Sequence, residues 1–207
     1  MPVAVLHVTV AAERGGAEGI IETIVSRADA ARYRLMLATP RGGALARAWR
    51  ERGWMVIETP PVARLARIDQ QVAVTRALAR EVKARGIALV HTHGISAQMQ
   101  GGWAGRLARV PVICHAHDCH EASWSIDGLL HLAAARTPRA HTIAVSKTVA
   151  ASLAGRVGSE IEIIPNGVDA SPVAPAPDAP PAPLVVWCGR LQRWKGCHLF
   201  VRAAKIV

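Results

Sequence analysis

Short, continuously apolar runs alternate along this chain with segments of helical periodicity. Residues 3–10 form such a run, and residues 17–27 after it place isoleucines and valines at the spacing of one helix face. Strands that are apolar throughout are buried on both sides, which is typical of a parallel sheet with helices on both faces. The pattern predicts an α/β protein with a Rossmann-like parallel sheet.

The alternation continues through the first 164 residues. Strands are predicted at residues 3–10, 35–38, 54–57, 87–90, 110–114, 142–145 and 161–164, and helices at 17–27, 44–51, 69–85, 98–107 and 147–153. Asp69 is expected to cap its helix, and Val72, Leu78 and Val82 are expected to face the sheet. In a sheet of this kind the ligand binds beyond the carboxyl ends of the strands.

A proline-rich stretch divides the chain. Residues 171–183 contain six of the 13 prolines and are predicted to be an extended linker. They separate a first domain, residues 1–170, from residues 184–207, where a strand at 184–188 and a helix from about residue 194 are expected. One strand and one helix close no core, so residues 184–207 are interpreted as the start of an incomplete second domain.

Composition excludes several classes of protein. An apolar content of 51% with 19% charged residues excludes wholesale disorder. No apolar run reaches the ~18 residues of a membrane span, and residues 1–12 lack the basic start of a signal peptide. Four cysteines without a C-x-x-C pair are expected to be reduced thiols. The expected location is the cytoplasm.

The formal charge of +10 raises the question of nucleic-acid binding. Residues 60–110 alone carry 8 basic and 2 acidic side chains. With one Tyr and one Phe, however, the chain has no basic and aromatic platform for stacking bases, so nucleic acid is not an expected partner. The basic block fits either a solvated helix face or a surface for anionic lipid; its candidate residues are Arg64, Arg67, Arg76, Arg80, Lys83 and Arg85.

Histidines cluster after two predicted strands. His91 and His93 follow one, and His115, His117 and His120 follow another. Alternate residues of a strand point the same way, so each H-x-H pair could share a metal ion, but the run at 115–120 does not fit the H-x-H-x-D-H pattern of zinc hydrolases. His91, His115 and His120 are expected to cap strand ends by hydrogen bonding. His117, beside Asp118, is the preferred functional candidate, and no metal is expected.

Two glycine-containing segments are candidates for phosphate binding. Gly15 and Gly16 follow the first strand and precede a helix, which suits either a tight turn or an anion site. I-P-N-G-V-D at residues 164–169 is followed beyond the linker by G-R-L at 189–191 and K-G at 195–196. Arg190 and Lys195 fit either two solvated side chains or a cationic pair that converges on a diphosphate.

Taken in order, these motifs resemble those of retaining glycosyltransferases of family 4, and the resemblance runs over nearly the whole chain. It implies the GT-B fold, in which two Rossmann-like domains face a cleft. It implies that Gly15 and Gly16 lie near the donor phosphates, that His117 contacts the transferred sugar, and that Arg190 and Lys195 neutralise the leaving nucleoside diphosphate. The partners implied are a nucleotide-sugar donor and a glycan or lipid-linked acceptor, with no cofactor, and peripheral association with the inner membrane face.

The chain departs from the family in one respect. The E-x7-E motif of the donor domain, which holds the sugar and the ribose, is absent from the 207 residues. The chain alone is therefore expected to have little or no transferase activity, and a separate donor-domain chain is a further expected partner. A non-catalytic Rossmann-like binding module, a GT-B nucleotide-sugar 2-epimerase and, more distantly, a zinc hydrolase are the alternatives.

Overall fold

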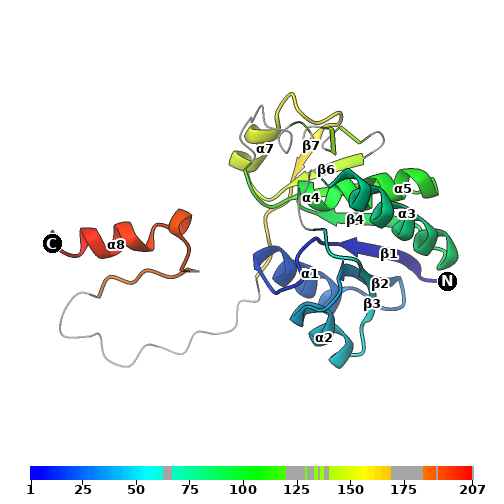
Figure 1. Ribbon diagram of the computed structural model, residues 1–207, viewed down its shortest axis with the longest axis horizontal. Coiled ribbons are helices and arrows are strands. Elements are labelled where there is room, and N and C mark those ends of the chain that lie inside the picture. The colour runs from blue at the N-terminus through cyan, green and yellow to red at the C-terminus, as the bar shows by residue number, and fades with distance from the viewer. Residues whose placement is uncertain are drawn as a thin grey trace. The chain divides into compact units, whose positions relative to one another are not determined.

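A seven-stranded, wholly parallel sheet forms the centre of the first of two compact units, Met1–Val168 and Asp169–Val207 (Figure 1). The computed structural model describes residues 1–62, 67–119, 129, 133–134, 136–137, 140–168, 184–189 and 191–206. The strands are β1 (Val3–Val8), β2 (Tyr33–Pro40), β3 (Met55–Thr59), β4 (Leu89–His93), β5 (Val112–Ala116), β6 (Ala140–Ala144) and β7 (Ile161–Ile163). Their order, β3-β2-β1-β4-β5-β6-β7, confirms the predicted Rossmann-like sheet. From β1 the chain first adds strands on one side, β2 and β3, and then on the other, β4 to β7, so the topological switch point lies between β1 and β4.

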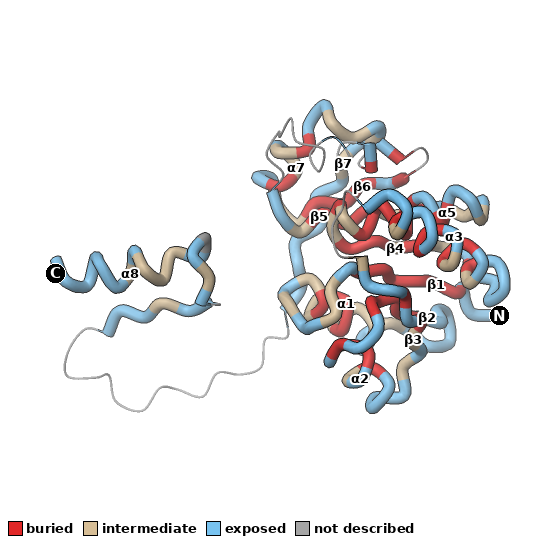
Figure 2. The backbone as a smooth tube through the Cα atoms, viewed as in Figure 1, coloured by how far each residue is buried: buried red, intermediate tan, exposed pale blue. Residues whose placement is uncertain are grey.

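Helices cover both faces of the sheet, as predicted. They are α1 (Gly16–Arg27), α2 (Ala44–Glu51), α3 (Ile68–Ala84), α4 (Ile95–Ala97), the π-helix η1 (Gln98–Gly102), α5 (Trp103–Ala108) and α7 (Lys147–Leu153). Neighbouring residues of β2 show the two layers. Met36 packs in a cluster with residues of α3 and α5, whereas Leu37 packs with residues of α1 and α2. The central strands are accordingly buried along most of their length (Figure 2).

Strands β4 and β5 extend two to three residues further than the predicted 87–90 and 110–114. The apolar run stops at the first histidine, but backbone pairing continues, with Thr92 opposite Cys114 and His93 opposite His115. His91, His93 and His115 therefore lie within strands and do not follow them. The expectation that His91 and His115 cap strand ends is wrong, and His120 lies outside the described residues.

The predicted inner face of α3 is partly wrong. Val72 is 39% exposed, and the buried stripe consists of Gln71, Val74, Thr75, Leu78, Ala79 and Val82. Asp69 is not the N-cap, because α3 begins at Ile68, one residue earlier. It lies in the first turn and forms an ion pair with Arg67 at 2.8 Å, where a carboxylate still complements the helix dipole.

The second unit contains the 3-10 turn η2 (Arg193–Lys195) and helix α8 (Cys197–Ala203). The strand predicted at 184–188 does not form. An apolar segment becomes a strand only when a neighbour completes its backbone hydrogen bonds, and no strand is present in the part of this unit that the structure describes. Across the described ranges of both units, no helix is long and apolar enough to cross a membrane.

Gly43, the residue before α2, lies against the loop after β1. A Cβ there would be 2.0 Å from the Ala12 carbonyl oxygen, which accepts a hydrogen bond from the Leu45 amide. Gly43→Ala is expected to lower the free energy of unfolding by about 3 kcal/mol in urea denaturation, because the backbone must move. Gly19→Ala is the control: its Cβ meets nothing within 4 Å, and alanine should stabilise α1 by up to ~1 kcal/mol. Equal losses in both variants would contradict this explanation.

Candidate functional site

Five histidines gather at the carboxyl ends of the three strands around the switch point. His7 lies on β1, His91 and His93 on β4, His115 on β5, and His117 directly follows β5. His7 pairs in register with His91, and His93 with His115, so these four side chains project from the same face of the sheet. Their neighbouring ring centroids lie 4.3–5.4 Å apart.

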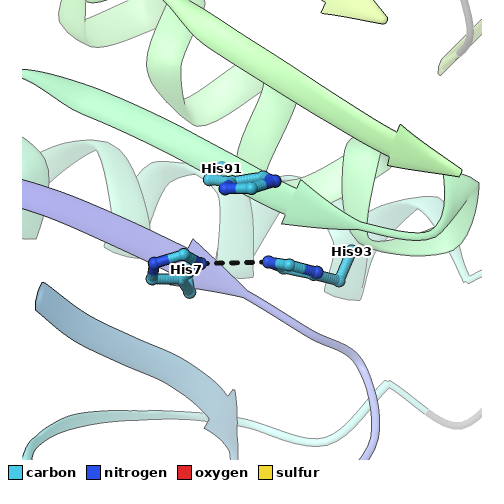
Figure 3. A group of neighbouring side chains, drawn as sticks. All are labelled: His7, His91 and His93. Atoms are coloured by element: carbon cyan, nitrogen blue, oxygen red, sulfur yellow. Dashed lines mark hydrogen bonds between the residues drawn. The ribbon is translucent and has the colours of Figure 1, made fainter. Parts of the chain in front are cut away.

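Three of the rings form a hydrogen-bonded chain. Nδ1 of His7 lies 3.0 Å from Nε2 of His93, and Nδ1 of His93 lies 3.1 Å from Nε2 of His117 (Figure 3 draws the first of these bonds). A neutral imidazole has one donor and one acceptor nitrogen. His93 therefore donates to one neighbour and accepts from the other, so its tautomer determines which nitrogen of His117 carries the proton.

Burial keeps these imidazoles neutral. It lowers the pKa of His7 to about 4 and that of His115 to about 4, with charge repulsion among the rings adding to the effect. The pKa values of His91 and His93 fall well below the usual value, also chiefly through burial. Burial also lowers the pKa of His117, although the carboxylates of Asp118 and Glu18 oppose the shift. At neutral pH the cluster is a set of uncharged donors and acceptors.

The glycine loop after β1 is held by a buried carboxylate. Glu18 accepts a hydrogen bond from the Thr9 hydroxyl at 2.6 Å and one from the Gly15 amide at 3.1 Å. Gly15 is the N-cap of α1, and Gly16 is its exposed first residue. The Glu18 carboxylate also opposes the lowering of the His117 pKa, which indicates that this helix start lies on the same side of the sheet as His117.

Two residues of this site, one in the histidine cluster and one at the glycine loop, are absent from the sequence predictions. His7 stands inside a buried apolar strand, where a lone polar residue is the signal that could have identified it. Glu18 stands three residues after Gly15, the position from which an acidic side chain reaches back to the amide before a helix. Both residues lie in patterns that predict only secondary structure, His7 in an apolar strand and Glu18 at a helix start.

The predicted site residues are divided between the two units. Gly15, Gly16 and His117 belong to the first unit, at the carboxyl edge of the sheet. Lys195 belongs to η2 of the second unit, where its carbonyl accepts a hydrogen bond from the Trp187 indole at 3.1 Å. Arg190 lies outside the described residues.

Several solved structures share this fold. HepE of Anabaena, in complex with UDP and glucose, superposes with a TM-score of 0.64 at 18% identity over 80% of this chain and 45% of its own. The lipopolysaccharide outer core galactosyltransferase WaaB gives 0.61 at 11% identity over 82% and 47%. A glycosyltransferase of Rickettsia africae gives 0.59 at 16% identity over 81% and 44%. This likeness shows the shared fold, that of GT-B N-terminal domains.

The chain spans a little under half the length of these solved proteins. No curated protein matches the sequence. The family model of glycosyltransferase family 4 matches residues 14–172, which is about three quarters of the chain. The matched residues include the glycine loop, both H-x-H pairs and the I-P-N-G-V-D segment. The chain therefore belongs to glycosyltransferase family 4.

Proposed function

We propose that the protein containing this chain transfers a sugar from a nucleotide-diphosphate sugar to a hydroxyl of a glycan or lipid-linked acceptor, with retention of configuration. The observation that carries this proposal is the family match over residues 14–172. HepE, which shares the fold, has been solved with UDP-glucose. The first unit is the acceptor-side domain in this proposal, and the second unit belongs to the donor side.

His117 is assigned to the transferred sugar. It follows β5 at the edge of the sheet where ligands bind in open α/β folds. Its Nε2 is engaged by His93 at 3.1 Å, and its Nδ1 is buried and has no hydrogen-bond partner among the described residues, so Nδ1 is the nitrogen assigned to the sugar. A neutral imidazole suits this role because it forms a directed hydrogen bond with a sugar hydroxyl.

The donor diphosphate is assigned to the glycine loop and the two cations. The Gly15 amide is bonded to Glu18, so Gly16 and the first turn of the 12-residue helix α1 supply the amides and the positive end of the helix dipole. Arg190 and Lys195 are assigned to the negative charge that develops on the diphosphate as the glycosyl group leaves. In this scheme fixed cations replace a metal ion at the diphosphate.

Acceptor-dependent release of nucleoside diphosphate is the test of this function. The whole enzyme is incubated with a panel of UDP-, GDP- and ADP-sugars, with and without lipid-linked glycan acceptors. If the enzyme transfers a sugar, nucleoside diphosphate should be released from one of these donors, and only when an acceptor is present. A 2-epimerase would convert the donor sugar without an acceptor, and a binding module would release nothing; either result overturns the proposal. The 207-residue chain alone is expected to be inactive. Robust sugar transfer by this chain alone would refute that expectation.

The membrane is proposed as the place where a lipid-linked acceptor is met. Of the six basic candidates, Arg67 and Arg85 form ion pairs with Asp69 and Glu81, and Arg64 lies outside the described residues. Three others on α3 are exposed and form no ion pair with any described residue: Arg76, Arg80 and Lys83. Exposed apolar side chains accompany them on α3 and on α5, which packs against it: Ile68, Val72, Trp103 and Leu107.

Cations beside exposed aromatic and aliphatic side chains suit a surface with anionic headgroups. The chain is expected to co-sediment with phosphatidylglycerol-containing vesicles but not with pure phosphatidylcholine, and less in high salt. The triple variant Arg76→Gln, Arg80→Gln, Lys83→Gln should lose most of this binding. A triple variant of the same charge change away from α3, Arg32→Gln, Arg41→Gln, Lys147→Gln, should retain it. Equal binding to both kinds of vesicle would contradict the membrane role.

A further inference from the structure

Three imidazoles, one from β1 and two from β4, converge on a common point. One ring nitrogen from each of His7, His91 and His93 lies within 4.8 Å of those of the other two. Figure 3 shows the nitrogens of His7 and His93 facing each other, with the His91 ring beside their hydrogen bond. Convergence of three imidazole nitrogens is the arrangement by which proteins hold transition-metal ions.

These rings have more nitrogens than hydrogen-bond partners. His7 and His93 are 1% and 4% exposed. Nε2 of His91 is buried and has no hydrogen-bond partner within the described ranges. A buried polar atom without a partner costs about 1–3 kcal/mol, and a bound ion is one of the groups that offsets that cost.

We propose that His7, His91 and His93 form a binding site for a zinc-like transition-metal ion beneath the carboxyl end of the sheet. Zinc–imidazole bonds are 2.0–2.1 Å long, which separates the ligand atoms of a tetrahedral site by roughly 3.4 Å. The Nδ1 of His7 and the Nε2 of His93 are 3.0 Å apart, so small side-chain shifts suffice. The ion takes the place of the hydrogen bond between these two rings, and each ring keeps its one proton on its other nitrogen, Nε2 of His7 and Nδ1 of His93.

A second triad, His93, His115 and His117, satisfies the same distance criterion. Both triads use His93 and both contain buried ring nitrogens without a hydrogen-bond partner among the described residues, so the backbone positions of the ligands decide between them and favour the first. His7 and His91 are register partners on adjacent central strands, with His93 two residues further along β4, so the backbone fixes all three ligands. His117, in contrast, lies beyond the end of β5.

The ion would act on His117 through His93. When Nε2 of His93 binds the metal, its Nδ1 carries the proton and donates to Nε2 of His117, 3.1 Å away. His117 then carries its own proton on Nδ1 and is a hydrogen-bond donor toward any further ligand. The role of the ion is to set this tautomer and to stabilise the sheet edge. The site itself depends on none of the proposed transferase chemistry.

Cobalt titration of the untagged, metal-free 207-residue chain tests the site. The expected result is saturable 1:1 binding with the visible absorption of four- or five-coordinate Co²⁺, displaced by Zn²⁺. His91→Gln should weaken binding by about 100-fold or more, since a direct ligand is lost. His141→Gln is the matched control, because His141 is an exposed histidine paired with Glu162, and it should bind as the unmodified chain does.

Two further measurements distinguish the loss of a metal ligand from the loss of folded structure. Far-UV circular dichroism must show that His91→Gln has the sheet and helices of the parent chain, and X-ray absorption at the zinc edge of the parent should show three imidazole ligands. Absence of saturable 1:1 binding by the parent chain would overturn the proposal. So would affinity that survives His91→Gln but falls in His115→Gln, because the ion would then occupy the other triad.

Discussion

Replacing His117 with alanine is expected to lower kcat/KM of the whole enzyme by about 10²- to 10³-fold, the range typical of one positioned polar group at a reacting centre. His117 follows β5 at the switch-point edge and is held there by the hydrogen bond from Nε2 to His93. Alanine removes both the contact with the sugar and the end of the imidazole chain. The loss should fall mainly on kcat, because a reacting-centre contact strengthens in the transition state.

Steady-state kinetics with a saturating acceptor measures this loss. His117→Gln retains a side-chain hydrogen-bond donor and should recover part of the activity. His141→Ala is the control: His141 lies on β6 with its ring exposed and paired with Glu162 at 2.9 Å, so its replacement should leave kcat/KM within about twofold. A His117→Ala enzyme with parental kcat would remove His117 from the site.

Acid is expected to destabilise the first unit as the pH falls from about 6.5 to about 4. The pKa of His7 in the folded chain is about 4, against 6.5 for an unperturbed histidine, so between these values the unfolded state binds the extra proton. Folding stability is complete above pH 6.5 and is lost as the pH falls toward 4. For His7 alone this amounts to about 3 kcal/mol. His115, with a pKa of about 4, adds a loss of the same sign.

Urea denaturation of the metal-free chain at pH 8, 6.5, 5.5 and 4.5 measures this dependence in the presence of a chelator. Most carboxylates titrate at or below the lower end of this window, so they contribute little to the slope. Glutamine does not titrate, so His7→Gln should reduce the dependence of the unfolding free energy on pH by the contribution of His7. His141→Gln should leave this dependence unchanged. A free energy of unfolding that stays constant from pH 8 to 4.5 would contradict the neutral buried cluster.

Much of the fold is predictable because parallel sheets impose a strong pattern on the sequence. The helices predicted at 44–51 and 147–153 coincide with α2 and α7. Their ends are marked locally, as at Ser146, whose hydroxyl accepts a hydrogen bond from the Val149 amide. Apolar runs likewise locate all seven strands, because strands buried on both faces cannot include many polar residues.

The errors have a common physical origin: local pattern cannot show which side chains meet in space. His91 and His115 end their apolar runs, yet β4 and β5 continue through them because neighbouring strands supply backbone partners. Val72 fits a helical stripe, but α3 packs against α5 and η1 with a different stripe buried, and Val72 is left exposed. The apolar run at 184–188 gains a strand conformation only beside a partner strand.

The candidate site was predictable only in part for the same reason. Gly15, Gly16 and His117 come from motifs with recognisable spacing, and the structure places them at one edge of the sheet. His7 is 84 residues from His91 in the chain, and only the register of β1 with β4 brings the two together. Glu18 is identified by its contacts with Thr9 and Gly15.

Proton NMR of the reaction product tests the assignment of this chain to a retaining, family-4 sugar transfer most directly. The whole enzyme is supplied with an α-configured nucleotide sugar and a lipid-linked acceptor, and the anomeric proton of the new linkage is observed. For a sugar of the gluco or galacto series, the proposed function predicts a small, α-type coupling constant, together with one nucleoside diphosphate released per linkage formed. A product of β configuration, or donor consumption without a new glycosidic linkage, would contradict it.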